Sequence, residues 1–196
     1  MIPPQTAVSR TVIRGLLLAA AASLLAGCIS LFPKADPAQL YRFGATAPQV
    51  QETASAGPAF GVFLTVTGFD RAAANDRILT VTGTQAAYIK GARWVTSSVA
   101  LFDSALQHAF DADQGPARLV ARGEIATADY VLKLDVRTFE VRYDNGQAAA
   151  PTIVVDVDAA LDRASDQTLV GDRSFKASIT ASDNRVDAIA QAFDQV

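Results

Sequence analysis

Three long β-strand patterns follow one another near the C-terminal end of the chain, and they constrain the fold more than any other feature. They cover Asp129 to Tyr143, Thr152 to Leu161 and Leu169 to Ala181. Only short segments separate them, and both Asp144-Asn145-Gly146 and residues 163–166 have the composition of turns. Because short turns join antiparallel neighbours, the sequence predicts that these strands pair one after another in a sheet.

The first of these strands changes the face on which its apolar residues lie. Leu134 and Val136 share one face by alternation, whereas Phe139 and Val141 share the other. A β-bulge contains one extra residue and therefore restores the alternation. The sequence predicts such a bulge near Arg137–Thr138.

The second strand alternates without interruption. Its odd-numbered residues from Ile153 to Leu161 are apolar and are expected to point inward, whereas Asp156, Asp158 and Asp162 are expected to point to water. Paired carboxylates such as Asp156 and Asp158 can bind calcium or exchange protons. Alternating acids on the solvent face of an antiparallel sheet are the simpler interpretation.

Two segments have helical periodicity. Apolar residues recur at helical spacing between Thr96 and Ala112, with hydroxyl side chains at its start as candidate N-caps, and a second amphipathic pattern runs from Asn184 onward. The stripe of the first helix consists of Val99, Phe102, Leu106, Ala109 and Phe110. Shorter strands are expected at residues 40–43, 60–66, 77–81 and 85–89.

The N-terminal segment has the composition of a secretory signal peptide. Arg10 and Arg14 begin it, and the 12 uncharged residues from Gly15 to Ala26 are fewer than the roughly 20 that span a bilayer. Leu25-Ala26-Gly27-Cys28 resembles the bacterial lipobox, in which cleavage precedes the cysteine and its thiol is acylated. An ordinary signal peptide is the alternative, but it leaves the only cysteine of a secreted chain unexplained. Cys28 is therefore the expected lipidation site.

This cleavage site divides the precursor. Residues 1–27 are expected to form the lipoprotein signal peptide, residues 28–59 a lipidated tether with a short strand and a linker, and residues 60–196 an α+β domain. An aspartate after the lipobox cysteine resembles an inner-membrane retention signal, and Ile29 stands there instead. The resemblance therefore implies a lipid anchor on the periplasmic face of the outer membrane.

The residues on which most catalytic and metal sites depend are scarce. The chain has one cysteine and one histidine, so no second residue of either type exists to build a zinc site. His108 falls on the flank of the first helix, away from its apolar stripe. Loss of Arg10 and Arg14 lowers the net charge from −3 to −5, and no basic block remains to bind nucleic acid. The sequence predicts a protein that is no enzyme and holds no cofactor or metal.

Arg93-Trp94 leaves two interpretations open. Trp94 is the only tryptophan and directly precedes the first helix, so it can close the core at that junction. Tryptophan and arginine are also enriched among the residues that dominate binding energy at protein interfaces. Core packing is the favoured interpretation, and Arg93 with Trp94 stays a candidate partner interface.

A series of short motifs occurs in a characteristic order along the chain. They are Leu31-Phe32-Pro33, Tyr41-Arg42-Phe43, Asp76-Arg77-Ile78, Tyr88 with Ala92-Arg93-Trp94, Ala128-Asp129-Tyr130 running into Phe139-Glu140, and Ala192-Phe193-Asp194. In this order they resemble the ABC-type transport auxiliary lipoprotein family, of which paraquat-inducible protein C is the best-known type. The resemblance implies a single compact α+β domain with a mixed, mainly antiparallel sheet and two main helices packed on one face.

The same resemblance implies a function. Family membership implies a periplasmic lipoprotein of an ABC-type transporter that has a mammalian-cell-entry (MCE) type substrate-binding protein and moves lipids between the two membranes. The chain would dock this periplasmic component to the outer membrane. An envelope-assembly lipoprotein that activates a cell-wall synthase or scaffolds an outer-membrane complex is the alternative. Direct carriage of lipid would need an apolar pocket of several hundred Å³, and formation of a homo-oligomer is also left open.

Overall fold

A computed structural model describes residues 37–44, 60–113, 115–120, 123 and 128–196. Cys28 and nearly all of the predicted linker lie outside these residues. Ala38 to Val196 form one compact unit, to which the description below applies. Its elements are β1 (Gln39–Tyr41), β2 (Phe60–Leu64), β3 (Gly68–Phe69), β4 (Arg77–Thr82), β5 (Gln85–Trp94), α2 (Ser98–Ala112), β6 (Ala117–Leu119), β7 (Tyr130–Arg142), β8 (Thr152–Arg163), β9 (Leu169–Thr180) and α3 (Val186–Phe193).

The long strand β7 organises the sheet. Along one edge it pairs antiparallel with β8, which in turn pairs antiparallel with β9. Along its other edge β7 pairs parallel with β2, then β3, then β4, each over only two or three residues. β4 and β5 form an antiparallel hairpin, with β1 parallel to β5, and β6 lies parallel to β2. The sheet is therefore mixed, and its long pairings are antiparallel.

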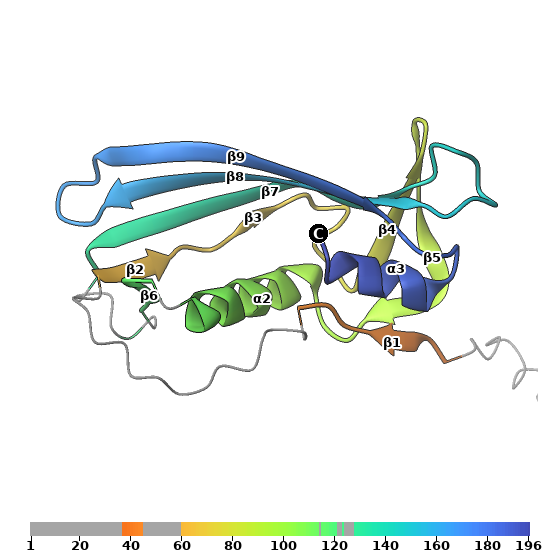
Figure 1. Ribbon diagram of the computed structural model, residues 1–196, viewed down its shortest axis with the longest axis horizontal. Helices are drawn as coiled ribbons and strands as arrows, with labels where there is room; N and C mark the ends of the chain where they lie inside the picture. The colour runs from red at the N-terminus through yellow and green to blue at the C-terminus, as the bar shows by residue number, and fades with distance from the viewer. Residues whose placement is uncertain (1–36, 45–59, 114, 121–122, 124–127) are drawn as a thin grey trace, which may run out of the picture. The chain divides into compact units, whose positions relative to one another are not determined.

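Both helices lie on the same side of this sheet (Figure 1). Side chains from α2 and α3 join those of β7 and β8 in one hydrophobic core. At the start of α2 the hydroxyl of Ser97 accepts a hydrogen bond from the backbone N–H of Ala100, which satisfies one of the free donors of the first turn. The predicted α+β domain, with a mixed sheet and two helices on one face, is confirmed.

The predicted bulge in β7 is also confirmed. The pairing register between β7 and β8 shifts between Val136 and Thr138. Val136 and Leu134 before the shift, and Phe139 and Val141 after it, all belong to the core or pack against it. One extra residue therefore keeps a single face of this strand apolar along its length.

The aspartates of β8 differ from the prediction. Asp162 does not point to water: it is 7% exposed, and a carboxylate oxygen lies 2.5 Å from Nζ of Lys133. Asp158 pairs with Arg137 and Asp156 pairs with Lys176. Neighbouring strands supply a cation to each of these carboxylates, which a single strand's alternation does not reveal. Within the described residues the outer face of β7, β8 and β9 is a row of ion pairs, and no three acidic, histidine or cysteine side chains gather into a metal site.

Gly44 allows the chain that follows β1 to pass close to α2. Its φ is +71°, and an added Cβ would stand 2.5 Å from Cβ of Ala105. Gly91 has nearly the same φ, +72°, but open space around its Cβ position. The two glycines therefore share the cost of a left-handed backbone for an L-residue, about 1–2 kcal/mol, and differ only in steric contact.

We expect Gly44→Ala to lower the free energy of unfolding by about 1–3 kcal/mol more than Gly91→Ala, because overpacking adds to the backbone cost. Urea unfolding of both variants measures the difference. Equal losses in the two variants would show that Gly44 does not set the distance between this segment and α2.

Candidate functional site

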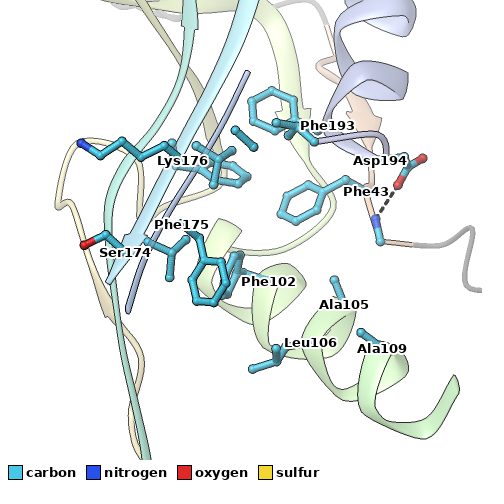
Figure 2. A pocket seen from close by; sticks show the side chains of 16 residues that line it. Phe43, Phe102, Ala105, Leu106, Ala109, Ser174, Phe175, Lys176, Phe193 and Asp194 are labelled. Carbon is cyan, nitrogen blue, oxygen red and sulfur yellow. Dashed lines mark hydrogen bonds between the residues drawn. The ribbon is translucent and has the colours of Figure 1, made fainter. Parts of the chain in front are cut away.

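An apolar groove opens between α2, the strands β8 and β9, and the end of α3 (Figure 2). It encloses about 730 Å³, which is within the usual range for ligand sites. We call it the apolar groove throughout. Its lining residues are Phe43, Gly44, Phe102, Ala105, Leu106, Ala109, Phe139, Val155, Val157, Ser174, Phe175, Lys176, Ala177, Phe193, Asp194 and Val196.

The floor of the apolar groove is the edge of an aromatic cluster. Phe139 lies 4.7 Å from Phe193 and 5.2 Å from Phe43 between ring centroids. Phe69 joins Phe139 to Phe102 at 5.4 and 6.0 Å. Such tilted and edge-on pairs add to the stability that burial of the rings provides. The floor is therefore a fixed part of the core.

One wall comes from α2. Phe102, Ala105, Leu106 and Ala109 are spaced by three and four residues, so they share one face of the helix. The sequence predicted this face through Phe102, Leu106 and Ala109. In the structure these residues border an open groove, and Leu101, which lies outside the predicted stripe, is the buried apolar residue of α2.

The opposite wall comes from β8 and β9. Val155 pairs with Ala177 and Val157 with Phe175, so the four side chains share the face that α2 covers. Phe175 remains 51% exposed. Figure 2 shows that Ser174 and Lys176 point to the other side of β9. This alternation was readable in the sequence, but the groove arises only because β9 lies across from a helix some 70 residues earlier in the chain.

The polar side chains that line the groove already have partners within the protein. Asp194 accepts a hydrogen bond from the backbone N–H of Gly44 at 2.5 Å. Ser174 donates to Asp158 and Lys176 pairs with Asp156, both on the outer face. Nδ1 of His108 lies 3.3 Å from the carbonyl oxygen of Gly44, which places the histidine on the helix flank. This chemistry favours the burial of an apolar chain or segment over proton transfer.

The residues of the candidate interface lie in different environments. Trp94 is 2% exposed and packs edge-on against Phe43 and Phe193, with centroids 5.0 and 5.2 Å away. Arg93 is on the surface, where its Nη1 donates to both carboxylate oxygens of Asp76 in an ion pair. Trp94 ends β5 and closes the core there, so of this pair only Arg93 has an exposed side chain.

A family model for the ABC-type transport auxiliary lipoprotein component matches residues 41–196. This chain belongs to that family. The match covers every described strand and helix of this family member except the first two residues of β1. Within the residues that the structure describes, neither helix is long and apolar enough to cross a bilayer.

Two solved structures share the fold of this family member. A protein from Xanthomonas campestris, assigned to a family of unknown function, is 25% identical, with a TM-score of 0.62 over 80% of this chain and 85% of that one. An uncharacterised protein is 13% identical, with a TM-score of 0.60 over 82% of this chain and 91% of that one. No curated protein matches the chain.

Proposed function

We propose that this family member is a non-enzymatic periplasmic lipoprotein of an MCE-type ABC lipid transport system. In this proposal Cys28 carries the lipid anchor, which holds the chain on the periplasmic face of the outer membrane. The folded domain docks the transporter's periplasmic MCE-type component. The family supports an auxiliary role beside an ABC transporter, and the resemblance of the motifs to the family whose best-known type is paraquat-inducible protein C supports the MCE-type system.

The apolar groove is the observation that carries the docking proposal. Monomeric proteins rarely leave a large contiguous apolar surface uncovered, and such surfaces mark sites of interaction. Here apolar side chains of α2, β8 and β9 face one another across about 730 Å³, while the polar lining side chains already have partners within the protein. An apolar segment of the periplasmic component would bury both walls at once.

A charge placed inside the groove tests this assignment. Ala109 lines the groove and is exposed on α2, so Ala109→Glu places a carboxylate in the groove without removing core packing. Gln107→Glu makes the same charge change at an exposed position of α2 that does not line the groove. Glutamate is a good helix former at either position. Both variants are therefore expected to fold.

We expect Ala109→Glu to reduce co-purification of the MCE-type component at least about tenfold, since an unpaired carboxylate resists desolvation. Gln107→Glu is expected to leave it unchanged. The measurement is affinity purification of the full chain from detergent-solubilised membranes, followed by mass spectrometry.

Three results would contradict the proposal. Recovery of a cell-wall synthase in place of transporter components would support the envelope-assembly alternative. Lipid that co-purifies with the wild-type chain and is lost in Ala109→Glu, with no transporter protein recovered, would make the groove a lipid carrier. Equal recovery of the MCE-type component with both variants would move the docking surface away from the groove.

A further inference from the structure

The outer edge of β9 is the long free edge of the sheet. Among the described residues β9 pairs only with β8, and β8 in turn pairs with β7. Figure 1 shows β9 along the border of the sheet. Each of its residues from Leu169 to Ser178 is exposed. A free strand of this length presents unpaired backbone donors and acceptors to another chain.

We infer that β9 pairs antiparallel with β9 of a second copy of this chain, about a twofold axis beside Ser174. The inference stands on the edge itself and does not depend on the proposed transport function. The pairing uses Gly171 to Ala177, where the register of β9 against β8 is regular. A register shift lies just before this stretch, because Leu161 pairs with Gly171 and Asp162 with Leu169.

Geometry limits the registers that two identical strands can adopt. Side chains directly opposite one another in an antiparallel pair lie on the same face of the sheet. Neighbouring residues of one strand lie on opposite faces. A twofold axis between two β9 strands must therefore pass beside a residue and not between two residues. Only a few centres within Gly171–Ala177 remain.

Charge selects one of these centres. Pairing about Ser174 places Asp172 opposite Lys176 of the second copy, and by symmetry Lys176 opposite Asp172. Pairing about Asp172, Arg173 or Lys176 would instead oppose two like charges directly, which is destabilising. Pairing about Phe175 would place Asp172 opposite a serine. The sequence of this edge is thus complementary to itself in one register.

The side chains of β9 are placed for this pairing. Lys176 is 75% exposed, with Asp156 of β8 3.0 Å away on one side, and the second copy's Asp172 would lie on the other side. The carboxylate of Asp172 has no hydrogen bond or ion pair within the part of the chain that the structure describes. On the opposite face the Arg173 guanidinium lies 5.8 Å from the centroid of Phe175. In the paired strands this guanidinium would also lie opposite the Phe175 ring of the second copy.

A cysteine placed at the axis tests the register in the full chain. At the axis two copies of residue 174 would be about 4.5–5.5 Å apart between Cα atoms, a separation that a disulfide spans. Ser178→Cys is the matched control on the same face of the same strand. Two copies of residue 178 would be eight residues apart along the strands, roughly 27 Å.

We expect mild oxidation of the full chain in detergent to cross-link Ser174→Cys well above both Ser178→Cys and the wild type. The wild type gives the background from Cys28. Cross-linking that is equal at positions 174 and 178, or no higher than the wild type at both, would overturn the inference. So would a monomer mass by light scattering for the wild-type chain at every concentration measured.

Charge reversal tests the ion pairs separately. Asp172→Lys would place two lysines opposite one another at two symmetric positions, and we expect the dissociation constant of the pair to rise about tenfold. Asp144→Lys, an equal change of net charge away from β9, is expected to have no effect. Unchanged association of Asp172→Lys, or an equal loss in Asp144→Lys, would overturn the register.

Discussion

Replacement of Trp94 by alanine is expected to lower the free energy of unfolding by about 3–5 kcal/mol. The indole is 2% exposed and packs against Phe43 from the segment after β1 and Phe193 from α3. Its loss would leave a cavity where three distant parts of the chain meet. Because domains of this kind have a total stability of about 5–15 kcal/mol, the variant should be close to its folding limit.

Urea unfolding of the compact unit from Ala38 to Val196 measures this loss. Arg93→Ala is the matched control, since Arg93 is the neighbouring residue and its side chain is 45% exposed in an ion pair with Asp76. A surface pair of this kind contributes at most about 1 kcal/mol. An unchanged midpoint for Trp94→Ala, with a wild-type emission maximum typical of exposed tryptophan, would return Trp94 to the candidate partner interface.

Cys28→Ser is expected to abolish acylation and signal-peptide cleavage while the folded domain stays unchanged. The thiol is the only one in the chain, so no other side chain can accept a thioether-linked lipid. One acyl chain binds a membrane only marginally, and two or more hold stably. Without the thiol, the chain is therefore expected to lose its stable lipid anchor. Labelling with a fatty-acid probe and the size of the product measure both effects.

Ile29→Asp serves as the control for this variant. It changes the next residue and leaves the thiol, so labelling and cleavage should persist while the chain moves to the inner-membrane fraction. Normal labelling of Cys28→Ser would contradict the lipoprotein assignment. Normal labelling of Ile29→Asp without a change of membrane would contradict only the expected sorting rule.

The local sequence pattern was sufficient to predict those strands and helices that are defined by their own residues. The alternation of β7 revealed both the strand and its bulge, because the alternating stretches before and after the bulge are each several residues long. The helical stripe of α2 was found in the same way. β3 and β6 were missed, since two or three residues carry no periodicity and exist as strands only through pairing with β7 and β2. β5 was predicted too short, because it continues past Lys90 and Gly91 to reach Trp94.

The candidate site was less predictable than the fold. The apolar groove combines α2, β8, β9 and α3, and no single segment shows that two apolar faces stay apart after folding. Asp162 illustrates the same limit. Its position in an alternating strand indicated exposure, whereas the burial and the ion pair with Lys133 come from the neighbouring strand.

Photo-crosslinking from within the groove tests the docking assignment most directly. A photoreactive amino acid at position 109 lies in the groove, and the same amino acid at position 107 lies on α2 outside it. In intact envelopes that contain the full transporter, position 109 is expected to give a covalent adduct with the MCE-type periplasmic component, and position 107 is expected to give none. An adduct of that component from position 107 alone, or adducts from position 109 only with lipid or a cell-wall synthase, would contradict the account.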